Sequence, residues 1–160
     1  METGSLITTS ALDFRAALPA GGTLLALDLG TQTIGTAFCD AGWRFASPAK
    51  TLNRGKFGAD RMLMAGLVAE RSAKGIVIGL PINMDGSEGP RSQSSRAYAR
   101  NLAVLGLPIL LWDERWSTAS AERGLIAQDI SRAKRVGRID SAAAAVILQA
   151  AIDALAGGFS

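Results

Sequence analysis

The sequence has no histidine and a single cysteine, and these two absences narrow the chemistry open to the protein. Without imidazole, mechanisms that need histidine as a base, a nucleophile or a metal ligand are excluded. The lone Cys39 excludes an intrachain disulfide and a zinc site built from several thiolates. Aromatic residues make up only 6% of the chain, so we expect little base stacking and place Trp43 and Trp116 in the core. Carboxylates, hydroxyls, lysines and arginines remain to carry the chemistry.

Long apolar runs are also missing. No segment approaches the ~20 residues of a membrane-spanning helix, and residues 1–11 lack the pattern of a signal peptide. We therefore expect a cytoplasmic protein without a membrane partner. The length of 160 residues, with 48% hydrophobic and 19% charged residues, is typical of one globular domain.

The charge is unevenly distributed along the chain. The formal net charge is only +3, but residues 91–138 hold nine basic and four acidic residues, a local excess of +5. This segment is either an ordinary solvated surface or a surface that faces phosphates. Charge alone slightly favours the ordinary solvated surface.

Hydrophobic patterning predicts an α/β fold with a mixed five-stranded sheet and helices on both faces. Short connections indicate an antiparallel meander first, and later continuous apolar runs indicate parallel strands buried on both faces. Residues 1–22 are predicted to be an N-terminal extension, with a short helical pattern at 11–18, and residues 23–160 the folded domain. The strands are expected at 23–29, 34–39, 43–47, 75–79 and 109–112, and the helices at 57–72, 91–105, 118–127 and 139–156, with a basic loop at 128–138.

Three acidic residues stand where predicted elements begin or end. Asp28 ends the first strand, Glu114 follows the strand at 109–112, and Asp140 begins the last helix. If the first, fourth and fifth strands are neighbours, Asp28 and Glu114 lie side by side and the last helix can bring Asp140 to them. Such a cluster needs protons or a divalent cation, and oxygen ligands suit Mg²⁺ or Mn²⁺. Two such ions can activate water for phosphodiester hydrolysis without histidine.

Each of these features also has a purely structural interpretation. Asp140 could cap a helix, and Glu114 could pair with Arg115 or Arg123 at the surface. The glycines of residues 28–35 fit a hairpin, although the same stretch has the phosphate-loop pattern of actin-like kinases and ATPases, which need two lobes. The loop at 79–90 is either a capped surface loop or a phosphate-binding loop.

Four segments together resemble the YqgF/RuvX family of Holliday-junction-resolvase-like proteins. They are residues 25–30 with 34–37, residues 78–81 with 83–88, residues 113–115 with 117–118, and residues 140–143. The resemblance implies a ribonuclease H-like fold and a metal-dependent nuclease that processes the precursor of the small-subunit (16S) ribosomal RNA, with the ribosome as a partner. It carries over Asp28, Glu114 and Asp140 as the catalytic and metal-binding residues, with Mg²⁺ or Mn²⁺ as cofactor.

Two alternatives stay open beside this interpretation. One is a junction resolvase acting on branched DNA, which needs a dimer to cut two strands symmetrically. The other is a nucleic-acid-binding or ribosome-assembly module with little turnover. All three interpretations share a nucleic-acid-binding surface, and the residues predicted to contact it are Asn83, Ser87, Arg91, Arg115, Arg132, Lys134, Arg135 and Arg138.

Overall fold

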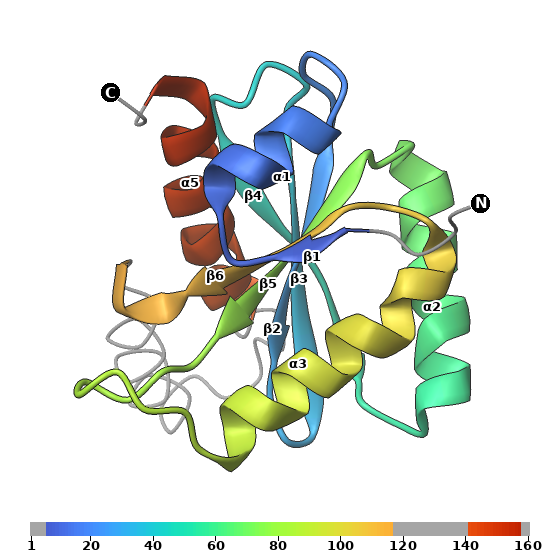
Figure 1. The fold of residues 1–160 in the computed structure, drawn as a ribbon. Coiled ribbons are helices and arrows are strands. Elements are labelled where there is room, and N and C mark those ends of the chain that lie inside the picture. Colours follow the sequence, from blue (N-terminus) through green and yellow to red (C-terminus); the bar gives the residue numbers. More distant parts are fainter. Residues whose placement is uncertain (1–5, 117–140, 158–160) are drawn as a thin grey trace, which may run out of the picture.

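A six-stranded mixed sheet forms the centre of the molecule in the computed structural model, which describes residues 6–116 and 141–157 (Figure 1). The four strands on one side of the sheet run parallel, and the remaining two continue it antiparallel. The expected meander followed by parallel strands is confirmed, with six strands in place of five. The spatial order is β1 (Ile7–Thr8), β6 (Ile109–Asp113), β5 (Gly75–Leu80), β2 (Leu24–Leu29), β3 (Thr33–Cys39) and β4 (Ala46–Asn53).

Helices cover both faces of this sheet (Figure 1). The side chains of the central strands alternate between two apolar cores, so that Val77 and Leu110 lie in one and Ile76 and Ile109 in the other. Burial on both faces explains why these strands read as continuous apolar runs. The first core packs α1 (Ala11–Ala17) and α5 (Ser141–Gly157), and the second packs α2 (Phe57–Arg71) and α3 (Pro90–Leu102), which continues into the 3₁₀ turn η1 (Ala103–Leu105).

The sixth strand comes from the segment that the sequence predicts to be an extension. Ile7 and Thr8 pair in parallel with β6. The helix that follows, α1, buries Phe14 completely in the core that α5 shares. A strand of two residues has no detectable period, so hydrophobic alternation could not reveal it. Residues 6–22 therefore complete one edge of the sheet.

The predicted third strand is wrong in its bounds. Residues 40–45 form a turn, because the Asp40 carboxylate accepts hydrogen bonds from three backbone N–H groups within it. Trp43 lies in this turn with a positive φ of 57° and is buried as expected. The strand itself runs over Ala46–Asn53 at the edge of the sheet, where none of its residues is buried. It therefore lacks the apolar alternation by which a half-buried strand is recognised.

The helices expected at 57–72 and 91–105 are confirmed, and the described part of the last helix, α5, agrees with the helix expected at 139–156. The helix expected at 118–127 and the basic loop at 128–138 lie outside the described residues. No helix in the described ranges is long and apolar enough to cross a membrane.

Candidate active site

The parallel strands β2, β5 and β6 end at the same edge of the sheet, and β5 lies between the other two. These are the first, fourth and fifth strands of the sequence analysis, and they are neighbours, as the clustering of the acids requires. Asp28 lies near the end of β2, and Glu114 follows β6 directly, at the start of the 3₁₀ turn η2 (Glu114–Trp116). Both residues are buried, with only 8% and 4% of their surfaces exposed. Two buried carboxylate residues therefore flank the end of β5.

Gly79 in β5 makes room for the Glu114 carboxylate. A Cβ atom at Gly79 would lie 2.5 Å from Oε2 of Glu114 and 2.7 Å from Cδ1 of Ile147 in α5. The Glu114 carboxylate thus lies over the backbone of Gly79, on the face that α5 covers. Leu27 of β2 pairs with Ile78, so Asp28 and Gly79 are the next residues along their strands. The Glu114 carboxylate is therefore held over the strand next to that of Asp28.

The start of α5 is anchored to the sheet one strand beyond Asp28. The buried Ser141 hydroxyl accepts a hydrogen bond from the Thr36 backbone N–H at 3.3 Å and contacts the Thr51 hydroxyl at 2.8 Å. Thr36 lies in β3, opposite Leu27 of β2. Asp140 precedes Ser141 in the chain but lies outside the described residues. Within the described ranges, no three histidine, cysteine, aspartate or glutamate side chains group as a metal site.

Arg115, a predicted nucleic-acid contact, is already paired. Its Nη2 lies 2.7 Å from Oδ2 of Asp113, and its Nε and backbone N–H also donate to that carboxylate. Burial raises the pKa of Asp113, but the hydrogen bonds and the charge of Arg115 outweigh it and hold the pKa below its usual value. Asp85 adds a second negative charge near Arg115. The charge of Arg115 is therefore largely compensated within the protein.

The loop between β5 and α3 is an exposed turn held by its own polar groups. The Asn83 N–H donates to the Ser87 carbonyl, and the Asn83 side-chain amide donates to the Ser87 hydroxyl. The Ser87 hydroxyl donates to Asp85, and this hydrogen bond lowers the pKa of Asp85. A Cβ at Gly86 would lie 3.8 Å from Nη1 of Arg115, so the turn lies beside the residue that follows Glu114. Asn83 and Ser87 are thus near the edge that holds the acids.

The RuvX family, described as "RuvX: Holliday junction resolvase", matches residues 22–154 of this sequence. The chain belongs to the RuvX family. Full-length relatives support the assignment: a protein of Sphingopyxis alaskensis is 66% identical over 94% of this chain and 99% of its own length, and one of Novosphingobium aromaticivorans is 66% identical over 95% and 98%. Both relatives carry the name "Putative pre-16S rRNA nuclease". This RuvX chain is thus a member of a family of enzymes that hydrolyse phosphodiester bonds of nucleic acids.

The fold of this RuvX chain is ribonuclease H-like, as expected from the sequence. RuvC of Thermus thermophilus, solved in complex with a Holliday junction substrate, matches with a TM-score of 0.53 over 85% of this chain and 96% of that chain. The two sequences are only 11% identical, so the match supports the fold and assigns no site residue.

Sequence reasoning missed three features of this RuvX chain. Trp116 was expected in the core but is 60% exposed, with its ring edge-on to Trp112 at 5.5 Å. Gly79 ends an apolar run, and a glycine there is a recognisable sign of close approach. Arg54 lies in the connection between β4 and α2, where no pattern marks it, yet its Nη1 donates to the Gly30 carbonyl at 2.7 Å. The predicted contacts Arg132, Lys134, Arg135 and Arg138 lie outside the described residues.

Proposed function

We propose that this chain is a cytoplasmic, divalent-metal-dependent nuclease that processes the 5′ end of the 16S ribosomal RNA precursor during ribosome biogenesis. The observation that carries the proposal is a pair of buried acids, Asp28 near the end of β2 and Glu114 just after β6, on either side of β5, with the Glu114 carboxylate over Gly79. The substrate is suggested by the two relatives at 66% identity, which are named for this RNA.

The donor set at this edge fits Mg²⁺ or Mn²⁺. Asp28 and Glu114 offer oxygen ligands only, and two buried acids that flank the end of β5 favour a nearby cation. The space over Gly79 is reserved for a carboxylate oxygen, since a Cβ would fill it. Asp28, Glu114 and Asp140 would hold the ions. A divalent ion supplies Lewis acidity toward the phosphate and makes water more acidic, which a site without histidine requires.

The residues around the acids would hold the RNA backbone. Asn83 and Ser87 lie in the exposed turn beside Arg115, and Arg91 lies beside the end of β2. Because Arg115 is already paired with Asp113, we assign it a positioning role for that turn and expect a weaker contribution to RNA affinity than from unpaired arginines. The remaining proposed contacts are Arg132, Lys134, Arg135 and Arg138, from the basic segment.

The test compares wild type with Asp28→Asn on a 16S precursor transcript in Mg²⁺ or Mn²⁺. We expect Asp28→Asn to lose at least about a hundredfold in cleavage rate, because an amide cannot replace an anionic metal ligand. Asp153→Asn, an exposed change of the same kind on α5, is the matched control and should cleave as wild type. Asp28→Asn should still bind the RNA. Equal residual cleavage in wild type and Asp28→Asn would contradict the catalytic assignment.

Junction resolution is a second candidate, favoured by the description of the family. It requires two active sites in a symmetric dimer. Paired symmetric cuts in a synthetic four-way junction, together with a dimeric mass in solution, would favour it over precursor processing. Tight RNA binding by a wild-type chain that cleaves neither substrate would instead indicate an assembly module.

A further inference from the structure

Two arginines near the end of β2 are held by backbone carbonyl groups, whereas three other described arginines are held by carboxylates. Arg44, Arg96 and Arg115 each form an ion pair with a carboxylate. Within the described part of the chain, Arg54 and Arg91 form no such pair and instead donate to backbone carbonyl groups. Within the described residues, neither guanidinium group is therefore closed into an ion pair, and both side chains are held in place.

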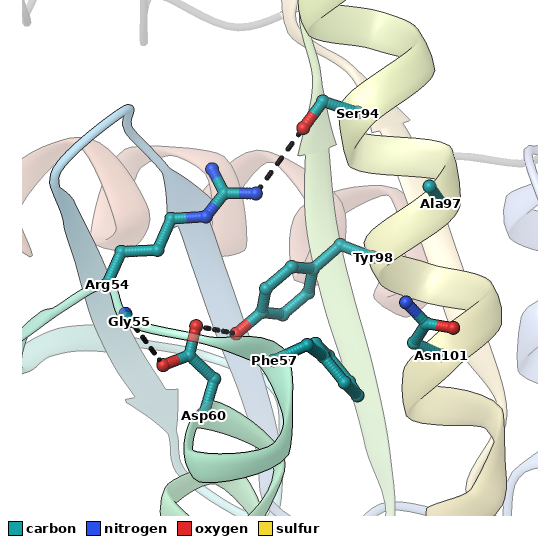
Figure 2. Close-up of a pocket in the computed structure, with 8 residues that line it drawn as sticks. All are labelled: Arg54, Gly55, Phe57, Asp60, Ser94, Ala97, Tyr98 and Asn101. Carbon is teal, nitrogen blue, oxygen red and sulfur yellow. Dashed lines mark hydrogen bonds between the residues drawn. The ribbon is translucent and has the colours of Figure 1, made fainter.

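The backbone carbonyls that hold them belong to consecutive residues. Arg91 Nη2 lies 3.2 Å from the oxygen of Leu29, and Arg54 Nη1 lies 2.7 Å from the oxygen of Gly30. Arg54 is fixed further by a hydrogen bond from Nη2 to the Ser94 hydroxyl at 3.3 Å and by stacking over the ring of Tyr98, 5.2 Å from its centre (Figure 2). Both guanidinium groups are thus ordered before any ligand arrives, which lowers the entropy lost on binding.

A pocket of about 160 Å³ lies between the two arginines. Besides Arg54 and Arg91, its described lining residues are Thr31, Ser94 and Ser95, which carry hydroxyl groups, and Leu29, Gly30 and Pro90; none of these described residues is a carboxylate. Its volume corresponds to about five liquid waters, so a phosphate group fits. The lining therefore offers cationic and hydroxyl donors to an anion.

A larger cavity of about 260 Å³ adjoins this pocket and shares Arg54 and Ser94 with it. Its lining includes the buried Asp60, whose carboxylate accepts hydrogen bonds from the Gly55 N–H and the Tyr98 hydroxyl (Figure 2). This negative charge disfavours an anion in the larger cavity. The smaller pocket is the place for a phosphate.

We propose that Arg54 and Arg91 form a subsite for a backbone phosphate of a polynucleotide, next to the bond that is cleaved. The subsite rests on the proposed nuclease function, because the carbonyl groups that hold the two arginines belong to the two residues that follow Asp28 in the chain. A strand that crosses the end of β2 meets the acids on the face that α5 covers and the two arginines on the side of α3. The planar fork of arginine matches phosphate oxygens, and two such forks fix the register of the strand.

The test measures binding of a fluorescent single-stranded RNA, and of DNA of the same sequence, in EDTA at several salt concentrations. Arg54→Gln and Arg91→Gln should each weaken binding about fivefold at low salt and lower the slope of log affinity against log salt by about 0.7, the value of one single-strand phosphate contact. Arg100→Gln is the matched control, since it removes the same charge from an exposed position on α3 outside both cavities. Arg54→Lys keeps the charge without the fork and should recover the slope but only part of the affinity.

The outcomes separate the subsite from the nuclease function. Equal losses in RNA and DNA binding support a phosphate contact, whereas a loss for RNA alone assigns the pocket to the ribose hydroxyl and overturns it. Slopes for Arg54→Gln and Arg91→Gln equal to that of Arg100→Gln, in folded proteins, also overturn it. If the wild type does not cleave RNA in Mg²⁺ or Mn²⁺ but the slopes of the variants change as expected, the subsite stands and the proposed nuclease function fails. Arg91→Gln, at an exposed position, keeps the test decisive if Arg54→Gln unfolds.

Discussion

Gly79 offers the sharpest test of the candidate active site, because it separates the position of the Glu114 carboxylate from the packing of the fold. A methyl group at this position would approach Oε2 of Glu114 to 2.5 Å and Cδ1 of Ile147 to 2.7 Å. Neither contact is tolerable for a Cβ atom, so Gly79→Ala must move both side chains. Gly79 does not have a positive φ, so the backbone itself accepts alanine.

The expected stability change follows from two opposing effects. Overpacking a filled core costs about 1–3 kcal/mol, and replacing glycine at a compatible backbone position recovers about 0.4–1 kcal/mol. The net loss in free energy of unfolding is therefore about 1–2 kcal/mol, which lowers Tm by about 3–6 °C in a chain of this size. The effect on catalysis is larger, because a catalytic group displaced by ~1 Å costs about a hundredfold in rate.

Two further variants make the measurement decisive. Ile147→Val deletes Cδ1, so Gly79→Ala with Ile147→Val should regain about 1 kcal/mol relative to the sum of the single changes. It should not regain cleavage, since the contact with Glu114 remains. Gly66→Ala, in the middle of α2 with nothing within 4 Å of the new methyl, is the control. It should raise stability by about 1 kcal/mol and leave cleavage unchanged.

Thermal unfolding and metal-dependent cleavage of the precursor RNA, measured on the same preparations, supply both readouts. If Gly79→Ala cleaves the RNA at the rate of the wild type, the reasoning is refuted, because the position of Glu114 over β5 would then not affect catalysis. Recovery of cleavage together with stability in the double variant would also refute it, since the defect would then come from packing alone.

Three further predictions concern the surroundings of the acids. Ser141→Ala should lower unfolding free energy by about 1–3 kcal/mol in thermal unfolding, because the buried Thr36 N–H loses its acceptor; no loss would contradict the anchoring of α5. The pKa of Asp113 is lower in the folded protein than in the unfolded chain, so its ionised carboxylate stabilises the fold at pH values above the ordinary aspartate pKa, and this stabilisation is lost as the pH falls through the lower folded pKa. Asp113→Asn should therefore make the free energy of unfolding depend less on pH in the acid range. An unchanged pH dependence would contradict this. Mg²⁺ or Mn²⁺ should raise the Tm of wild type but not of Asp28→Asn, and EDTA should reverse the shift; equal shifts would place the ion elsewhere.

The central strands could be predicted because their burial leaves a direct trace in the sequence. Ile76, Val77 and Ile78 form a continuous apolar run, which is typical of a parallel strand between two layers of helices. The edges of the sheet leave no such trace: β1 has only two residues, and β4 has no buried residue. The two errors of the prediction, in the number of strands and in the bounds of the third strand, therefore both fall at the edges of the sheet.

The residues of the candidate site also fall into those that could be proposed from the sequence and those that could not. Asp28 and Glu114 could be proposed from the sequence, because a carboxylate next to a buried strand is costly without a compensating partner. Arg54 could not, since its role depends on a contact with Gly30 that joins two separate connections of the chain. Asp60 leaves a weak signal in the sequence, because it lies in helical register with the buried Met64 and Leu67 of α2. A charged residue on this apolar face of the helix indicates a buried polar partner.

The pairing of β3 with β4 also affects how the start of α5 is held. The register between the two strands shifts between Gly35 and Ala37, so that Thr36 has no β4 partner in the ladder and donates its N–H to Ser141. Gly35 pairs with Asp28 across β2 and β3, which places this irregularity at the level of the candidate active site. Bulges next to active sites commonly re-aim groups in this way. The described start of α5, at Ser141, is thus held by a backbone donor 105 residues earlier in the sequence, which no local pattern could reveal.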